Sequence, residues 1–290
     1  MTDPTQAVVW LDGAIREPGL AAVPWSDHGV TVGDGIFETL LLVDGRPFAL
    51  RRHLRRLARS ADGLGIELPD GSTLRRAVSE TCDAWGTAPG RLRITVTSGP
   101  GPMGSERGDA GPTLLVAATS VPAPAAATTV ALVPWTRNER GALAGLKTTS
   151  YGENVVALAA ARQHGATEAV LANTAGELCE GTGSNILVVH GDDLVTPPLE
   201  SGCLAGITRE LLLEALARAG TPAVERSLPF DVLLRCPAAA LTSSTRNVQP
   251  IETVVDLDGG RRNLATDHPL LVTALRAWDD AHGPGTDPDP

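Results

Sequence analysis

Residues 145–156 read GLKTTSYGENVV and contain two residue types found nowhere else in the chain. Lys147 is the only lysine among the 290 residues, and Tyr151 is the only tyrosine. Arginine stays protonated and cannot act as a nucleophilic amine, whereas a desolvated lysine can lose its proton and condense with an aldehyde. The pattern therefore favours a chemical role for Lys147. Its alternative is a solvated surface lysine left by composition drift.

Length and composition indicate a folded enzyme with a sizeable core. The chain is 42% hydrophobic and 20% charged, a balance typical of globular enzymes, and it is long enough for one large or two medium domains. The net charge of -10 argues against a general nucleic-acid or anionic-membrane surface, because both need a basic footprint. Any arginine that binds an anion must act locally.

The cysteine and histidine patterns favour a reducing compartment and argue against a metal site. The cysteines form no CxxC pair and read as buried thiols, and the histidines form no HExxH-type cluster. No signal-type segment and no apolar run of 18 residues are found. We therefore expect a cytoplasmic protein without a metal or a membrane span. The cysteines are Cys82, Cys179, Cys203 and Cys236.

The N-terminal part alternates strand and helix patterns. Residues 7–11, AVVWL, predict a strand that enters an Asp-Gly turn, and residues 36–43 predict another that ends in a second Asp-Gly turn. Apolar residues spaced by three and four predict a helix over 49–64, with most of its arginines on a solvated face. Further elements are predicted over 72–85 (helix), 91–97 (strand) and 113–119 (strand).

The C-terminal part reads as a second domain. The Pro/Ala segment 121–128 predicts an interdomain linker between a small domain, 1–120, and a larger one, 129–282, and residues 283–290 are expected to be disordered. Turn-rich strand patterns beside helices indicate an α+β domain with a mixed or barrel-like sheet. The predicted elements are a strand over 129–135, a helix over 153–164, hairpins pairing 168–173 with 177–181 and 184–189 with 193–198, a helix that opens at 206–208 and ends at Gly220, a strand over 239–244 and a turn over 245–250.

Four motifs, in order, resemble the class IV aminotransferases, the fold-type IV enzymes that use pyridoxal 5′-phosphate. They are GLKTTSYGENVVAL, ELCEGTGSNILVV, LAGITRELLLEAL and LTSSTRNVQPI, and DHGVTVGDGIFETL and HLRRLARSA match as well. The resemblance covers about residues 5–260. It implies a small N-terminal α/β domain, a larger C-terminal domain with a barrel-like mixed sheet and a site between them. It also implies a homodimer in which residues around Val30 to Phe37 approach the partner's site.

The resemblance assigns the cofactor-binding residues. Lys147 is the residue joined to the cofactor aldehyde and later acts as the proton-transferring base. Glu180 occupies the position of the carboxylate facing the pyridine nitrogen, and Tyr151 meets the ring oxygen; their alternatives are a turn acid and a core aromatic. Arg56 is expected to grip two phosphate oxygens, next to backbone N–H groups of a helix start. The remaining positions are Leu204, Gly206, Ile207, Thr208, Ser243 and Ser244.

Members of this family differ in how they hold the substrate carboxylate. Phe37 stands where D-amino acid aminotransferases place a carboxylate-binding tyrosine, and Ser98 stands where they have an arginine. Val32 replaces a tyrosine typical of branched-chain enzymes, whereas Arg93 occupies a position that is arginine there and lysine in some lyases. The candidate substrate-binding residues are Phe37, Arg93, Arg107, Thr245 and Arg246.

These departures favour 4-amino-4-deoxychorismate lyase, which releases pyruvate and leaves 4-aminobenzoate for folate synthesis. The LAGLK segment also resembles the lyase branch. The alternative is a transaminase of D- or branched-chain amino acids with 2-oxoglutarate or glutamate as co-substrate. A non-catalytic dimer that binds pyridoxal phosphate would predict a scrambled site, yet Lys147 and Glu180 are both present. The side chain and stereochemistry of the substrate stay open.

Overall fold

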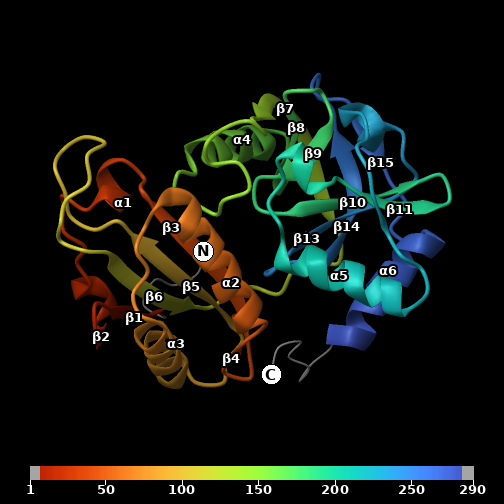
Figure 1. The fold of residues 1–290 in the computed structure, drawn as a ribbon. Helices are drawn as coiled ribbons and strands as arrows, with labels where there is room; N and C mark the ends of the chain where they lie inside the picture. The colour runs from red at the N-terminus through yellow and green to blue at the C-terminus, as the bar shows by residue number, and fades with distance from the viewer. Residues whose placement is uncertain (1–6, 283–290) are drawn as a thin grey trace. The chain divides into compact units, whose positions relative to one another are not determined.

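The computed structural model describes residues 7–282, which form two compact units (Figure 1). The first comprises residues 7–122 and Leu146–Tyr151, and the second comprises Ala123–Gly145 and residues 152–282. The chain first passes between them after Pro122, within the predicted linker. The predicted disordered tail, 283–290, lies outside the described residues.

The first unit is built on an antiparallel sheet with the strand order β2-β1-β6-β5-β3-β4. Both predicted Asp-Gly turns join neighbouring strands, and all four of their residues have positive φ, as two-residue hairpins require. The elements are β1 (Ala7–Leu11), β2 (Ala14–Arg16), η1 (Pro18–Leu20), α1 (His28–Thr31), β3 (Gly35–Val43), β4 (Arg46–Pro47), α2 (Leu50–Leu64), α3 (Gly71–Trp85), β5 (Gly90–Thr97) and β6 (Thr113–Thr119).

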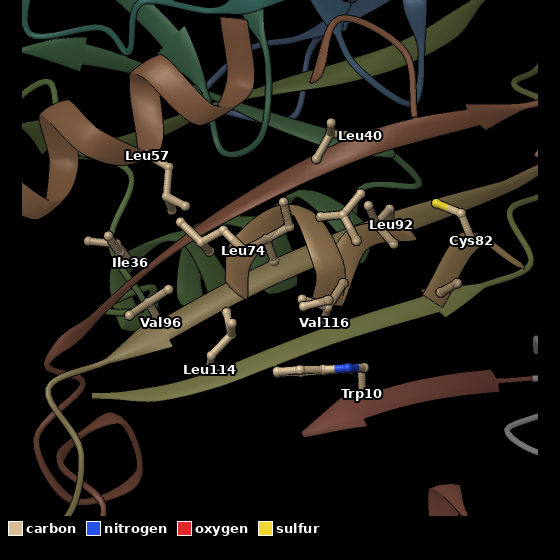
Figure 2. Close-up of a cluster of buried hydrophobic side chains, with 14 of the residues drawn as sticks. Trp10, Ile36, Leu40, Leu57, Leu74, Cys82, Leu92, Val96, Leu114 and Val116 are labelled. Atoms are coloured by element: carbon tan, nitrogen blue, oxygen red, sulfur yellow. The ribbon is translucent and has the colours of Figure 1, made fainter. Parts of the chain in front are cut away.

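Side-chain alternation divides this sheet into a core face and a second face. Ile36, Leu40 and Leu42 of β3 point into the core that α2 and α3 cover, and Figure 2 shows Leu57 and Leu74 of these helices in the same cluster. Because successive strand residues face opposite sides, the odd-numbered residues of β3 and β5 lie on the second face. Phe37 and Arg93 belong to that face.

The second unit is built on a mixed sheet with the order β12-β11-β10-β13-β14-β7-β8-β9, and β15 pairs with β14. The turn from β9 to β10, closed by Gly181 N–H donating to Ser184 O at 2.7 Å, connects the end of the sheet to its middle. The sheet is therefore curled, as the predicted barrel-like form requires. The strands are β7 (Thr128–Arg137), β8 (Glu168–Asn173), β9 (Leu178–Gly181), β10 (Asn185–His190), β11 (Asp193–Thr196), β12 (Val224–Glu225), β13 (Ala239–Ser243), β14 (Asn247–Val255) and β15 (Arg261–Asn263).

Three α-helices cover this sheet in the described part of the chain. α4 (Gly152–Gln163) packs on β7 and β8, whereas α5 (Ile207–Arg218) and α6 (Pro269–His282) pack on each other. Two short 3-10 helices, η2 (Leu199–Ser201) and η3 (Phe230–Leu234), complete the unit. None of the helices within 7–282 has the length and apolarity to cross a membrane.

The structure corrects three details of the sequence analysis. The predicted turn over 245–250 is shorter, because β14 begins at Asn247, a residue type that tolerates its left-handed φ of 53°. α6 has no counterpart among the elements predicted from the sequence. The segment Leu146–Tyr151 groups with the first unit rather than with the C-terminal one, since its backbone bonds to β3.

Candidate active site

The backbone around Lys147 is held on both sides within the first unit. Phe37 N–H donates to Lys147 O at 3.0 Å, and Thr149 N–H donates to Gly35 O at 2.8 Å, so the segment runs along the edge of β3. On the other side, Lys147 N–H donates to Ser60 Oγ of α2 at 3.1 Å. These bonds fix the point from which the lysine side chain projects.

The Gly33-Asp34-Gly35 sequence at the start of β3 makes room for this segment. Thr149 Oγ1 and Ser150 Oγ both donate to Gly33 O, at 2.8 and 2.9 Å. A Cβ on Gly35 would lie 2.9 Å from Thr149 Oγ1, and Gly33 has a φ of +71°, which favours glycine. The motif therefore serves a close backbone approach as well as a turn.

The Lys147 amine lies on an aromatic surface. Its Nζ is 3.2 Å from Tyr151 OH and 4.3 Å from the centroid of the Phe37 ring, and the two rings make an edge-to-face contact at 5.0 Å. The Arg93 guanidinium stacks on the same Phe37 ring at 3.7 Å. An amine, a phenol and a guanidinium thus converge on one ring, which creates a positive environment suited to an anionic substrate.

Behind this surface, Glu38 forms a buried network with α2. The carboxylate is fully buried and accepts hydrogen bonds from Arg56 Nε at 2.8 Å and Nη2 at 2.7 Å. His53 Nδ1 lies 2.6 Å from its Oε2. Burial alone would raise the pKa of Glu38, but Arg56 and His53 lower it to about 2.

Burial also lowers the pKa of His53, with added effects of the Arg56 and Lys147 charges, although Glu38 opposes the shift. The imidazole is therefore neutral at pH 7, and its Nδ1–H donates to Glu38. Arg56 is buried rather than solvated as most arginines of this helix were expected to be. Its grip on a cofactor phosphate stays a prediction, and the pair with Glu38 fixes its guanidinium in place.

In the second unit, Glu180 is a buried carboxylate that contacts Leu204 and Arg137. Its Oε2 accepts the Leu204 N–H at 2.9 Å, and its Oε1 is 3.2 Å from Arg137 Nε in an ion pair. Arg137 also donates to Asn154 Oδ1 at 3.3 Å. No sequence signal points to Arg137, because its pairing with Glu180 becomes visible only when β7 and β9 are placed in one sheet.

The thiols beside Glu180 are buried. All four cysteines are buried and free, as predicted. Burial, together with the charge of Glu180, raises the pKa of Cys203 to about 11 and raises that of Cys179 as well. Both side chains therefore stay protonated at neutral pH.

The start of α5 has the features of a phosphate site. Its N-cap is Gly206, no side chain caps the helix, and the N–H groups of Ile207 and Thr208 are in the first turn. On the neighbouring strand β13, Thr242 is 3% exposed and its hydroxyl has no hydrogen-bond partner among the described residues. A free helix N-terminus and a buried hydroxyl without a partner both fit the phosphate group of the expected cofactor.

Two of the arginines predicted to bind the substrate are hydrogen-bonded to other groups of the protein. Arg107 donates from Nε and Nη2 to Asp34 at 2.7 Å each, and to the carbonyls of Leu64 and Gly65 at the end of α2 at 2.8 and 2.6 Å. These hydrogen bonds lower the pKa of Asp34. The bonds tie the loop after β5 to α2, and a role of Arg107 in substrate binding stays a prediction.

Arg246 is held in the same way within the second unit. It donates to Gln249 Oε1 at 2.6 Å and to Thr167 O at 3.0 Å. The neighbouring Thr245 lies in the turn between β13 and β14 and is half-buried. The predicted residues thus form two groups, one in each unit: Phe37, Arg56, Arg93, Lys147 and Tyr151 in the first, and Glu180, Leu204, Gly206, Ile207, Thr208, Ser243 and Ser244 in the second.

Comparisons with known proteins agree on one family. A family model described as amino-transferase class IV matches residues 35–254. The bifunctional aminodeoxychorismate lyase / D-amino acid transaminase of Mycobacterium tuberculosis is 31% identical over 275 residues, covering 88% of this chain and 92% of that protein. The D-alanine aminotransferase of Bacillus licheniformis is 29% identical over 256 residues, covering 85% and 88%.

Solved structures are similar over nearly the full length. A branched-chain aminotransferase from Thermoproteus uzoniensis, crystallised with norvaline, has a TM-score of 0.84 and 28% identity, covering 94% of this chain and 93% of its own. A hypothetical aminotransferase from Mycobacterium tuberculosis in a PLP-bound form has a TM-score of 0.82 and 28% identity, covering 94% and 97%.

Proposed function

Since the chain belongs to the class IV aminotransferases, enzymes that depend on pyridoxal phosphate, we propose that it is a 4-amino-4-deoxychorismate lyase. It would release pyruvate from its substrate and leave 4-aminobenzoate for folate synthesis. The observation that carries the proposal is the convergence of Lys147, Tyr151 and Arg93 on the Phe37 ring. This arrangement offers an aromatic surface for the substrate ring, a base, and a cation for its carboxylate.

Lys147 carries the proton transfer. Pyridoxal phosphate supplies, when bound, an aldehyde that takes up amines and a ring that accepts electrons. The Lys147 amine would take the proton that leaves the substrate ring. The bond from the ring to the enolpyruvyl oxygen then breaks, the ring becomes aromatic, and the released enolpyruvate takes up a proton to give pyruvate. Tyr151 OH, 3.2 Å from Nζ, orients the amine.

Arg93 is the proposed carboxylate partner. In D-amino acid aminotransferases a tyrosine and an arginine are expected at the positions of Phe37 and Ser98, and neither residue here can replace them in binding a carboxylate. Arg107 is paired with Asp34. Arg93 stacks on Phe37 close to the reacting amine, with Nε donating to Thr95 Oγ1 at 3.2 Å. A planar guanidinium can bind a carboxylate through two parallel hydrogen bonds.

The remaining assignments concern the cofactor itself. Glu180 is proposed to face the pyridine nitrogen, where an anion keeps the ring protonated and electron-accepting. Arg56, Thr208 and the hydroxyls at the end of β13 are proposed to hold the phosphate, because a guanidinium and free N–H groups both favour a dianion. The residues proposed to bind the phosphate are Arg56, Ile207, Thr208, Ser243 and Ser244, with the buried hydroxyl of Thr242 beside them on β13.

A transaminase of branched-chain or D-amino acids is the second candidate. Arg93 favours it, since the resemblance places a substrate-binding arginine at this position in branched-chain enzymes. The relative from Mycobacterium tuberculosis carries both a lyase and a transaminase name. The same lysine would then move the proton of an amino acid, with 2-oxoglutarate or glutamate as co-substrate.

One experiment separates the two candidates. Purified protein loaded with cofactor is given aminodeoxychorismate, and 4-aminobenzoate is measured by chromatography. In parallel, the visible absorbance of the bound cofactor is followed after adding D-alanine, leucine or glutamate. If the protein is the lyase, 4-aminobenzoate should form, and the amino acids should convert the bound cofactor only slowly. Fast conversion of the cofactor to its amine form without any 4-aminobenzoate would refute the lyase.

We also propose that the active protein is a homodimer. Of the residues from Val30 to Phe37 that were expected near the partner's site, Val30 and Val32 are 66% and 45% exposed, whereas Ile36 and Phe37 are buried in this chain. Exposed valines beside the Lys147 segment support an interface there. The predicted cytoplasmic location stays a prediction.

A further inference from the structure

We propose that Asn185 is a positioning residue for two parts of the cofactor site. It holds Leu204, whose N–H bonds to Glu180, and it holds the start of α5. The inference rests on the proposed roles of Glu180 and of the α5 N-terminus. Asn185 is the first residue of β10 and is 4% exposed. Neither the motifs nor the family resemblance had assigned it a role.

The first contact lies at Leu204. Asn185 Nδ2 donates to Leu204 O at 2.8 Å, while Leu204 N–H donates to Glu180 Oε2 at 2.9 Å. Leu204 is thus bonded through both of its backbone polar groups. Because its N–H can reach Glu180 only in one orientation of the backbone, the bond from Asn185 helps to set the position of that carboxylate.

The second contact lies at Gly206. A Cβ on this residue would collide with Asn185 Oδ1, so the amide packs directly against the N-cap of α5. Gly206 has a φ of -68°, which any residue adopts. Glycine is therefore needed here for space and not for conformation. The Asn185 amide spans the segment Leu204–Gly206 and fixes where the N–H groups of Ile207 and Thr208 lie.

The same face carries the buried hydroxyl of the phosphate site. Asn185 is paired directly with Thr242 on β13, so their side chains lie on one side of the sheet. The proposed phosphate site therefore continues from α5 across Asn185 to Thr242. A single amide joins the part of the site that faces the pyridine ring to the part that faces the phosphate.

The test is a double-mutant cycle on cofactor affinity. Asn185→Ala and Gly206→Ala should each weaken the binding of pyridoxal phosphate to the apoprotein by about tenfold. This is the effect expected when one hydrogen bond that positions other contacts is lost. In the Asn185→Ala background, Gly206→Ala should reduce cofactor affinity much less, because the Oδ1 atom that the new Cβ would meet is absent. Additive effects of the two changes would overturn the proposal.

Two further variants separate positioning from packing. Asn185→Asp keeps the shape but loses the donor to Leu204 O, so it should bind the cofactor at least as weakly as Asn185→Ala. Asn173 is the matched control, since it is a buried amide that also bonds to the backbone. Its Oδ1 accepts hydrogen bonds from two N–H groups of the β8–β9 turn. Asn173→Ala should lower the melting temperature of the apoprotein and leave cofactor affinity unchanged.

Readouts beyond affinity identify which contact has moved. Asn185→Ala should weaken the binding of both pyridoxal phosphate and pyridoxal, because both ends of the site shift, and should change the pH dependence of the bound cofactor's absorbance. Unchanged affinity together with a fall in apoprotein stability like that of Asn173→Ala would reduce Asn185 to a structural amide. Glu180→Ala is the reference: if it leaves affinity intact, the proposed role of Glu180 has failed, whatever Asn185 does.

Discussion

The proposed chemistry depends on the amine of Lys147. Lys147→Arg keeps a long cationic side chain, but a guanidinium stays protonated and cannot condense with an aldehyde. We expect the rate to fall by about a thousandfold or more and the visible absorbance of the bound cofactor to disappear, measured by steady-state kinetics and spectroscopy. Arg235→Lys is the control for exchanging the two cations, since Arg235 forms an exposed ion pair with Asp231. Retained colour and activity in Lys147→Arg would refute the role of this lysine.

The buried network of Glu38 predicts a defined dependence of stability on pH. Because its pKa falls from 4.5 unfolded to about 2 folded, the carboxylate stabilises the protein above pH 4.5, and this contribution is lost as the pH falls toward 2. Glu38→Gln should lower the free energy of unfolding at pH 7 by about 3 kcal/mol, since it leaves Arg56 buried without its anion.

Urea unfolding of both proteins at pH 7, 5 and 3.5 measures this effect. The difference between wild type and Glu38→Gln should be constant between pH 7 and 5 and shrink at 3.5. Glu80→Gln removes an acid that accepts a hydrogen bond from Trp10 and serves as a control for losing one carboxylate. A gap that is equally wide at pH 3.5 would contradict the assignment of the shift to Glu38.

Single residues differed in how far the sequence could predict them. Lys147 and Tyr151 stand out by their rarity, and they lie 3.2 Å apart in the structure. Glu38 does have a sequence signal, because it is a carboxylate at a core position of a strand and therefore requires a buried partner. Arg137 carried none, because its partner Glu180 comes from another strand and only the sheet brings the two together.

The C-terminus of α2 gives a prediction that separates a structural arginine from a substrate-binding one. Arg107→Met removes the donors to Leu64 O and Gly65 O and the pair with Asp34. Because the side chain is 36% exposed, we expect a loss of about 1 kcal/mol of stability and an unchanged KM. Thermal unfolding and substrate titration measure both. A large rise in KM at unchanged stability would restore Arg107 to the substrate site.

Elements with a clear period were predictable, and those defined by long-range contacts were not. Alternation located β5, an Asp-Gly turn marked the end of β3, and spacings of three and four located α2, because all three patterns are local. The segment Leu146–Tyr151 has no period of its own and gains its place from bonds to Gly33, Gly35 and Phe37. The start of β14 at Asn247 was likewise hidden, since turn-type residues continue into the strand.

Assembly is tested by charging the exposed valines near the Lys147 segment. Val30 is 66% exposed, and an aspartate there would be harmless on a free surface but costly in an apolar interface. Val30→Asp should shift the protein from dimer to monomer in size-exclusion chromatography with light scattering and lower its activity. Leu257→Asp, at a site 56% exposed in the turn before β15, should change neither. An active monomer of the unchanged protein would refute the dimer.

Cofactor binding should order both units, because the residues proposed to hold pyridoxal phosphate are divided between them. A ligand that binds only the folded protein stabilises it by about 2.7 kcal/mol at a hundred times its Kd, and the protection should appear wherever contacts form. Adding pyridoxal phosphate to the apoprotein should therefore slow hydrogen exchange both at Leu146–Tyr151 and at the first turn of α5. Pyridoxine 5′-phosphate, which lacks the aldehyde, should protect α5 but protect the Lys147 segment less. Protection confined to one unit with pyridoxal phosphate would mean that the two groups of residues do not serve one cofactor.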